Sequence, residues 1–319
     1  MNNRVLITGI NGSGGSYLAE FLVSEHPEVE VHGLSRWHST TSSDNLSAIR
    51  HHITMHECDL LDLASTIRVL REVNPKIIFH LASHANVRVC FEIPLAVLNN
   101  NITSTANLLE AIRMVCPETL LHHCSTSEVY GNPLNFPMTE DHPLKPVNPY
   151  AVSKLTQEAL VHAYHKSWGI RTVITRMFAY INPRRRDLFA TSFAYQLVEI
   201  ERGKRDVLRY GNLDSIRNII DVRDAMRAYW VACEKCQDGE IYNVGGKVIL
   251  TVGQFLDTLL LHAKVPIIKA LDKNLLRPVD VTKQVPDTTK FDTITGFLPE
   301  YTLDESIEFL LDYCRKEVK

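Results

Sequence analysis

The segment Arg4–Gly15, with the sequence RVLITGINGSGG, decides the fold prediction. Its first five residues form a short apolar run that indicates a buried strand, and helical spacing begins after the last glycine. A loop with glycine at every third position can turn sharply and admit a pyrophosphate to its N–H groups, which a Cβ would block. The N-terminus of the next helix adds a partial positive charge for the phosphates. We therefore predict that this loop binds a dinucleotide through five residues: Gly9, Asn11, Gly12, Ser13 and Gly15.

The first half of the chain alternates between apolar runs and stretches of helical spacing. Strands are predicted over 4–8, 30–34, 54–58, 76–81, 119–124 and 171–178, and helices over 16–24, 64–73, 94–115 and 149–168. This alternation predicts an α/β protein with a Rossmann-like, doubly wound parallel sheet. After about residue 180, helices predicted over 188–201, 222–236, 252–262 and 303–316 alternate with polar segments. We therefore predict a nucleotide-binding domain over 1–178, to which a strand near 242–244 returns, and a smaller α/β substrate domain over 179–319.

Composition and charge exclude several classes of protein. The 319 residues are 45% hydrophobic and 22% charged, with a net charge of −3, which excludes a disordered chain and gives no electrostatic case for nucleic acid or a membrane as partner. No apolar run approaches the ~20 residues of a membrane-spanning helix, and the first residues lead into a strand rather than a secretory signal. Scattered cysteines are typical of a reducing compartment. We therefore expect a cytoplasmic protein. We expect no metal site, because the paired histidines have no acid at metal spacing.

The end of the second predicted strand indicates which dinucleotide binds. An acid at this point would favour NAD, because it accepts hydrogen bonds from the free 2′-hydroxyl of the adenosine ribose. The sequence here is Gly33–Trp37, GLSRW, in which Arg36 offers a cation and Ser35 a hydroxyl to a 2′-phosphate. We therefore predict NADP, with NAD as the second choice. The alternative for Arg36 is a solvated side chain at a strand end.

The ends of the next two strands extend the predicted cofactor site. Asp59 and Leu60 follow the third strand, where a carboxylate can accept the adenine amino group; a helix cap is the alternative for Asp59. Leu81 ends the fourth strand and is expected to contact the cofactor, and Ala82 and Ser83, which follow it, are expected to pass the nicotinamide.

Tyr150 and Lys154, in the segment NPYAVSK, are the first candidates for catalysis. A spacing of four residues puts both side chains on one face of the predicted helix. An ammonium group beside a phenol is expected to lower the phenol pKa, so that Tyr150 can accept a hydroxyl proton as hydride leaves the same carbon. Both residues would also contact the cofactor.

Polar residues at the end of the fifth strand are the second candidates, because ligands bind at the carboxyl ends of strands in such sheets. In the segment CSTSEVYG, Thr126 can share the substrate proton with Tyr150, and Ser127 can hold the same oxygen. Glu128 can remove a C–H proton beside a carbonyl or donate a proton to a leaving hydroxyl. The alternatives are turn capping for Thr126 and Ser127, and a charge pair with a nearby Arg or Lys for Glu128.

Three further residues are weaker candidates for binding substrate. Arg184 and Arg185 belong to the run RRR, which is either a phosphate clamp or a solvated set of loop charges. His84 follows the fourth strand and could line a sugar pocket.

Together these motifs resemble the extended short-chain dehydrogenase/reductase family, and within its nucleotide-sugar branch the GDP-mannose 4,6-dehydratases. The resemblance covers nearly the whole chain and is carried by TGINGSGGSYLAEFL, STSEVYG, PYAVSK, NPRRRD, YGNLDSIRN and LRPVDV. It implies Thr126, Glu128, Tyr150 and Lys154 as catalytic residues. It also implies that Arg217 and Arg277 contact the diphosphate or nucleotide of the substrate, and that the protein is a homo-oligomer, either a dimer or a tetramer.

The resemblance implies a lyase that converts a GDP-hexose, GDP-mannose above all, to its 4-keto-6-deoxy sugar with recycled NADP. There are departures from the family pattern. The dehydratases have an Asn-His pair after the sixth strand, where this chain has Ala179-Tyr180. The segment SIRNIIDVRDAMRAYW is closer to the reductases that act on GDP-4-keto-6-deoxymannose. An NAD(P)-dependent reductase or epimerase acting on a nucleotide sugar is therefore the alternative.

Overall fold

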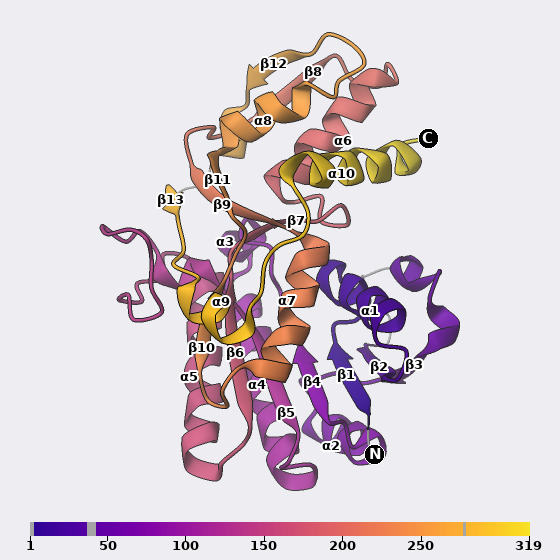
Figure 1. Ribbon diagram of the computed structural model, residues 1–319, viewed down its shortest axis with the longest axis vertical. Helices are drawn as coiled ribbons and strands as arrows, with labels where there is room; N and C mark the ends of the chain where they lie inside the picture. The colour runs from indigo at the N-terminus through magenta and orange to yellow at the C-terminus, as the bar shows by residue number, and fades with distance from the viewer. Residues whose placement is uncertain (1–2, 37–42, 277–278) are drawn as a thin grey trace.

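A computed structural model describes residues 3–36, 43–276 and 279–319. Figure 1 shows a larger half that holds a twisted sheet and a smaller half, built from later residues, above it. The sheet has seven parallel strands in the order β3-β2-β1-β4-β5-β6-β10; the chain adds strands first to one side of β1 and then, from β4 on, to the other side. This order confirms the predicted doubly wound, Rossmann-like sheet. The strands are β1 (Arg4–Thr8), β2 (Glu30–Ser35), β3 (Ile53–Glu57), β4 (Ile77–His80), β5 (Leu120–Thr126), β6 (Thr172–Met177) and β10 (Ile241–Val244).

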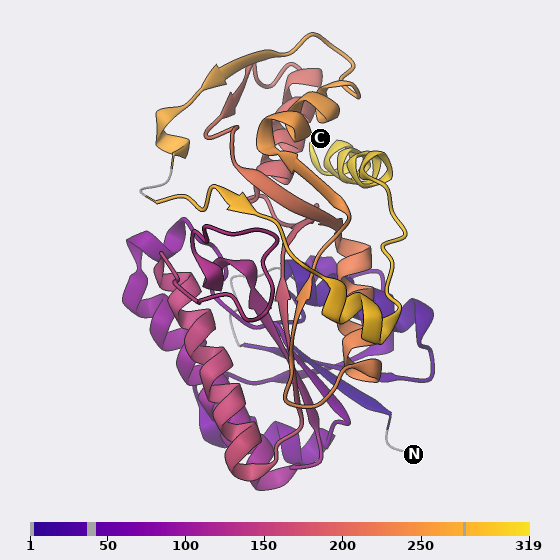
Figure 2. The same ribbon diagram turned by 60° about the vertical axis from the view of Figure 1, so that its left-hand side comes forward.

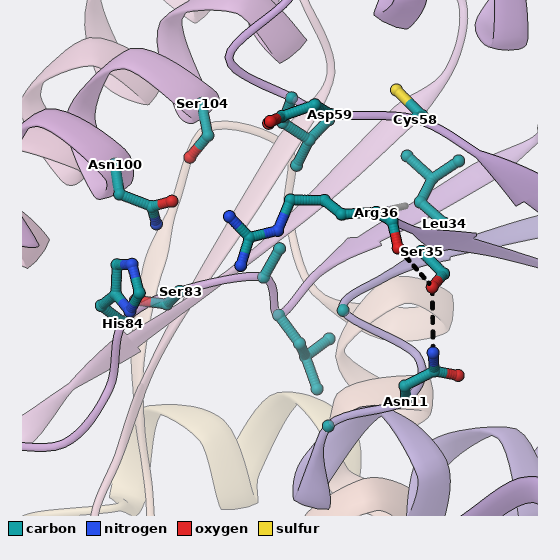
Figure 3. Close-up of a pocket in the computed structure, with 15 residues that line it drawn as sticks. Asn11, Leu34, Ser35, Arg36, Cys58, Asp59, Ser83, His84, Asn100 and Ser104 are labelled. Carbon is teal, nitrogen blue, oxygen red and sulfur yellow. Dashed lines mark hydrogen bonds between the residues drawn. The ribbon is translucent and has the colours of Figure 1, made fainter. Parts of the chain in front are cut away.

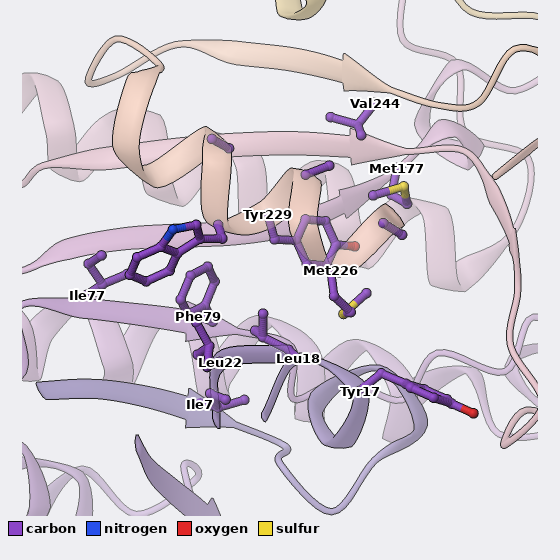
Figure 4. Packing of buried hydrophobic residues seen from close by; sticks show 14 of the residues in the cluster. Ile7, Tyr17, Leu18, Leu22, Ile77, Phe79, Met177, Met226, Tyr229 and Val244 are labelled. Atoms are coloured by element: carbon purple, nitrogen blue, oxygen red, sulfur yellow. The ribbon is translucent and has the colours of Figure 1, made fainter. Parts of the chain in front are cut away.

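Helices cover both faces of this sheet, so its strands are apolar on both sides. Successive side chains of a strand point to opposite faces; on β1, Val5 and Ile7 join one apolar cluster, whereas Leu6 joins the other. Figure 4 shows part of the first cluster, in which Leu18 and Tyr229 approach the sheet from two different helices. The helices are α1 (Ser13–Glu25) and α7 (Val222–Lys235) on this face, and α2 (Leu63–Val73), α4 (Pro94–Val115) and α5 (Pro149–Trp168) on the other.

The smaller half has an apolar cluster of its own between short strands and three helices. Its main sheet has the order β11-β9-β13, with β7 beside β9, and β8 pairs with β12. These elements are β7 (Ala179–Ile181), α6 (Phe189–Glu201), β8 (Val207–Tyr210), β9 (Ile216–Asp221), β11 (Val248–Thr251), α8 (Val252–Leu260), β12 (Ile268–Leu271), β13 (Lys283–Gln284) and α10 (Leu303–Glu317). The remaining short helices are η1 (Ser43–Leu46), η2 (Arg50–His52), α3 (Val89–Glu92), η3 (Ser127–Tyr130), η4 (Lys273–Leu275) and α9 (Thr289–Thr295).

The two halves of the chain are not separated at one point in the sequence. β10 lies at the edge of the large sheet, paired in parallel with β6, and α7 packs on the same sheet. The predicted domain boundary after residue 178 therefore describes the chain only in part, and it stays a prediction. The strands of the smaller half were not predicted, because they are short, partly polar and paired with distant segments.

Candidate active site

A cavity of about 160 Å³ lies at the carboxyl ends of β1, β2, β3 and β4. This edge of a doubly wound sheet is where dinucleotides bind. Figure 3 shows the side chains around it. Its lining includes nine of the residues predicted to bind the cofactor: Gly9, Asn11, Gly12, Arg36, Asp59, Leu60, Leu81, Ala82 and Ser83.

The glycine loop is shaped so that side chains cannot be added to it. Gly9 has a φ of +69°, and a Cβ on it would lie 2.9 Å from the Cα of Ala82 on the neighbouring strand end. A Cβ on Gly15 would lie 2.4 Å from the carbonyl oxygen of Gly9. Gly12, the N-cap of α1, provides no side-chain hydrogen bond to the first helical turn. The N–H groups of that turn are therefore left for an anion, which fits the pyrophosphate of a dinucleotide.

Ser35 and Arg36, at the end of β2, line this cavity; they are the two side chains expected to bind a 2′-phosphate. Asn11 Nδ2 donates to Ser35 Oγ at 3.0 Å, which ties the glycine loop to this strand end. In Figure 3 the Arg36 side chain extends across the cavity. Within the described ranges no ion pair engages Arg36, so the site offers its cation to an anionic ligand.

The structure distinguishes between the alternatives for Asp59 and places His84 in the lining of the smaller cavity. Asp62, not Asp59, caps α2, whereas Asp59 accepts a hydrogen bond from the Leu61 N–H and lines the cofactor cavity. His84 lines this cavity too, rather than the larger one where the sugar was expected. Burial and the charge of Arg36 lower the pKa of His84. The residues that follow His84 line the larger cavity, and a role of His84 toward the sugar stays a prediction.

A second cavity, of about 730 Å³, adjoins the first and extends between the two halves of the molecule. Gly9, Gly12, Leu81 and Ser83 line both cavities. The larger one collects most of the other predicted site residues: Ser13, Gly15, Thr126, Ser127, Glu128, Tyr150, Lys154, Arg184, Arg185 and Arg217.

Tyr150 and Lys154 lie one turn apart at the start of α5, and both are buried. Lys154 Nζ donates to the carbonyl oxygen of Cys124 at 2.8 Å, and burial lowers the pKa of this ammonium group. Burial raises the pKa of Tyr150 above its ordinary value, and the cation that opposes this effect is Arg185. In the protein without cofactor, burial is the largest influence on the pKa of Tyr150, so this pKa is raised rather than lowered as expected. The ammonium group of Lys154 is instead bonded to the Cys124 carbonyl on β5.

Glu128 is held by amide groups rather than by a cation. Asn148 Nδ2 donates to Glu128 Oε2 at 3.0 Å, and Gln284 Nε2 donates to Glu128 Oε1 at 3.3 Å. Of the described residues, none forms an ion pair with this carboxylate, which argues against the charge-pair alternative. Thr126 Oγ1 accepts a hydrogen bond from the Glu128 N–H at 3.3 Å, so Thr126 caps the turn and also lines the cavity.

Behind the catalytic candidates lies a buried ion pair that the sequence analysis missed. Glu158, one turn beyond Lys154 on α5, bonds to the guanidinium of Arg176 on β6 at 2.7 Å. Glu158 also accepts a hydrogen bond from Ser125, which adjoins Thr126 at the end of β5. The network therefore fixes the helix that carries Tyr150 against the strand that carries Thr126. Arg176, a charged residue inside the apolar strand RTVITRMF, was the signal in the sequence.

The predicted arginines have different environments. Arg184 bonds to Ser16 and Glu20 of α1 and stacks on Tyr17, so its guanidinium serves the glycine-loop helix. Arg185 is paired with Asp187 and donates to the Ala85 carbonyl at 2.9 Å. Arg217 lies on β9, 3.5 Å from Asp280. Arg277 lies outside the described residues. The substrate roles of these four arginines stay predictions.

Two kinds of site are missing from the part of the chain that the structure describes. None of its helices combines the length and apolar character that a membrane span needs. In the same ranges no three His, Cys, Asp or Glu side chains gather as a metal site requires.

Comparison with known proteins gives one consistent family. Residues 6–310 match the family described as GDP-mannose 4,6 dehydratase. The GDP-mannose 4,6-dehydratase of Yersinia enterocolitica is 31% identical, over 95% of this chain and 91% of its own length. The human GDP-mannose 4,6 dehydratase is 26% identical, over 96% of this chain and 89% of its own.

Solved structures agree with the sequence comparisons on the fold. The structure of RMD from Pseudomonas aeruginosa complexed with NADPH has a TM-score of 0.84 at 25% identity, and the match covers 99% of this chain and all of that one. DesIV from Streptomyces venezuelae, a dTDP-glucose 4,6-dehydratase with NAD bound, has a TM-score of 0.87 at 24% identity over 98% of this chain and 97% of that chain.

Proposed function

The chain belongs to the GDP-mannose 4,6-dehydratase family, and on this premise we propose that it is a lyase that converts GDP-mannose to the GDP-linked 4-keto-6-deoxy sugar. The observation that carries the proposal is the position of Glu128. Its carboxylate lines the same cavity as Tyr150 and Lys154, so a base for a C–H proton stands beside the pair that oxidises an alcohol. A simple alcohol dehydrogenase needs only the pair.

NADP is the cofactor that the site favours. The glycine loop and the bare first turn of α1 fit its pyrophosphate, and Ser35 with Arg36 fits its 2′-phosphate. When bound, NADP would supply reversible hydride transfer, from C4 of the sugar and back to C6, so that no net oxidation would result.

The protein's own residues would move the protons. Tyr150 accepts the proton of the C4 hydroxyl, Thr126 holds the C4 oxygen, and Lys154 holds the cofactor ribose. Once C4 is a carbonyl, the adjacent C5–H is acidic, and Glu128 removes this proton. Glu128 then gives the proton to the C6 hydroxyl, which leaves as water. As hydride reaches C6, C5 takes up the proton that Tyr150 accepted from the C4 hydroxyl, so the sum of the steps is the loss of one water from the hexose.

The deciding experiment incubates the purified protein with GDP-mannose and a catalytic amount of NADP. The expected product is lighter by one water, with no net reduction of the cofactor, as measured by mass spectrometry. An unchanged sugar, together with NADPH consumption only when a 4-keto sugar is supplied, would instead establish the reductase.

Glu128→Gln tests the proposed base. We expect water loss to fall by roughly 10²–10⁴-fold, because the amide cannot accept the C5 proton. Hydride exchange at C4 should persist, since Tyr150 and Lys154 are intact; it is measured with sugar deuterated at C4. Turnover equal to that of the wild type would remove Glu128 from the mechanism.

One feature favours the reductase as the second candidate. Tyr180 occupies the place of the family's histidine after β6, and its hydroxyl lies near the glycine loop, 3.5 Å from where a Cβ on Gly14 would be. Burial raises the pKa of this phenol. A second neutral proton donor in the cavity suits the reduction of a ketone, and the product analysis above separates the two reactions.

Two properties stay predictions with no bearing on this chemistry. The cytoplasmic location rests on composition and on the scattered cysteines. The dimer or tetramer rests on the family resemblance alone.

A further inference from the structure

The carboxylate of Glu128 accepts hydrogen bonds from two side-chain amide groups that come from distant parts of the chain. Asn148 approaches Oε2 from the N-cap position of α5, and Gln284 approaches Oε1 from β13. The exposed fractions are 9% for Glu128, 5% for Asn148 and 3% for Gln284. These hydrogen bonds stabilise the arrangement of the three side chains, because leaving a buried amide or carboxylate group unpaired would cost free energy.

The strand that carries Gln284 is fixed on both of its sides. On one side β13 pairs with β9, where Gln284 is in register with Arg217. On the other side the segment that follows β13 is bonded to the loop after β5: Met138 N–H donates to the Val285 carbonyl at 2.8 Å, and Asp287 N–H donates to the Met138 carbonyl at 2.7 Å. Figure 2 shows this segment, coloured yellow-orange, passing between the two halves of the molecule.

The register places two functions on one small sheet. Directly paired residues of neighbouring strands point to the same face of a sheet, so Gln284 and Arg217 share a face. Arg217 is one of the two arginines expected to contact the diphosphate or nucleotide of the substrate, and Gln284 donates a hydrogen bond to the expected base. The position of β13 therefore connects the part of the site that holds the nucleotide to the part that removes a proton.

On the basis of the proposed function, we propose that Gln284 is a positioning residue for proton removal: it orients the Glu128 carboxylate toward C5 of the sugar and couples that orientation to the substrate-binding sheet. Asn148 fixes the other oxygen, so the carboxylate cannot rotate about its terminal bond. Gln284 has no part in the earlier step, because Tyr150 and Lys154 form no hydrogen bond with it in the described structure.

The test separates the two steps in one substrate. In Gln284→Leu, with GDP-mannose and NADP in D₂O, we expect exchange of hydride at C4 to remain near the wild-type rate. Incorporation of solvent deuterium at C5 and loss of water should fall by roughly 10–100-fold, the scale of a misplaced catalytic group. The matched control is Lys283→Met on the same strand, whose ammonium group lies 4.2 Å from the ring of Phe136 and away from Glu128; it should leave both rates unchanged.

A second variant gives a readout that damage to the fold would not produce. Gln284→Glu keeps the shape but sets a carboxylate against Glu128, and two adjacent carboxylates resist double ionisation. The acid limb of the pH profile for water loss should therefore move to higher pH by about one unit or more. Among the described residues, Tyr150 is a titratable group on which the charge of Glu128 acts; it governs the C4 step and is unchanged in this variant, so the pH profile of C4 exchange should stay in place.

Each result supports or overturns the inference. A selective loss in Gln284→Leu, or a displaced acid limb in Gln284→Glu, supports it. An equal fall of both steps, or no change in either variant, overturns it while the proposed function stands. A wild-type protein that carries out neither step on GDP-mannose overturns the proposed function, and the positioning role with it.

Discussion

The two adjoining cavities are built in different ways. The cofactor cavity is lined by strand ends, loops and part of α4 within the first 104 residues, and its shape depends on backbone that glycine alone allows. The larger cavity depends on side chains that meet across long stretches of chain, such as Glu128 and Gln284, which are 156 residues apart. The cofactor cavity is thus built from the N-terminal third of the chain, whereas the choice of reaction depends on how the two halves are assembled.

The sharpest way to break the larger cavity alone is Tyr150→Phe. Loss of the hydroxyl removes the acceptor for the C4 proton, so we expect kcat to fall by about 10³-fold, within the usual range for a general base. NADP affinity should change little, because the glycine loop is untouched. Tyr164→Phe, on the same helix but bonded to Glu110, is the control and should keep full activity. A Tyr150→Phe enzyme with near-normal kcat would contradict the assignment.

Gly15→Ala disrupts the glycine loop, whose residues Gly9 and Gly12 line both cavities. The new Cβ would lie 2.4 Å from the Gly9 carbonyl oxygen and 2.8 Å from the Cα of Ile10, both backbone atoms. We expect a loss of stability of about 1–3 kcal/mol and a fall in NADP affinity of about 100-fold, seen by calorimetric titration. Gly14→Ala is the matched control, since its Cβ would meet only the Leu81 side chain, at 3.3 Å, and the Tyr180 hydroxyl. Equal NADP binding by Gly15→Ala and Gly14→Ala would refute this account of the loop.

Arg36→Ala tests whether the cofactor cavity distinguishes NADP from NAD. Removing the cation should weaken NADP by about 10–100-fold, the scale of a charge-assisted hydrogen bond of ~1.5–3 kcal/mol. NAD has no 2′-phosphate, so its affinity should change less than threefold. Fluorescence titration with both dinucleotides measures the ratio, and equal losses would mean that Arg36 does not choose the cofactor.

The histidines buried in the sheet beneath both cavities give a smaller, pH-dependent effect. Burial lowers the pKa of His80 on β4 and of His122 on β5 to about 3, against an ordinary value of 6.5. Below pH ~6.5 the unfolded chain binds these protons and the folded protein does not, so stability is complete above that pH and falls toward pH ~3. The slope should be about 1.4 kcal/mol per pH unit for each histidine. Urea unfolding at pH 7 and pH 5 checks this, and equal stability at both would show that the histidines are charged in the fold.

The same difference between local and assembled structure explains how far the sequence could predict this protein. The glycine loop, Arg36 and the pair Tyr150–Lys154 belong to short patterns with a defined chemistry, and the structure places them around adjoining cavities. Gln284 has no pattern around it: β13 is two residues long and exists because it pairs with β9. The Glu158–Arg176 pair could be suspected from one charge in an apolar strand, but its partner could not be chosen without the fold. The sequence also could not tell which of the two cavities His84 lines, because the direction of a loop is not encoded in the residues next to it.

The position of β10 limits how this enzyme can be divided or recombined. A fragment that stopped at residue 178 would lack both α7 and β10, which would leave β6 as an open edge and bare the apolar face that α7 covers. Such a fragment should aggregate rather than bind NADP. A chimaera with a new sugar specificity would have to graft separate insertions around a retained stretch from Val222 to Val244. A single crossover therefore cannot exchange the sugar-binding half of this fold without also replacing α7 and β10, in the laboratory or in evolution.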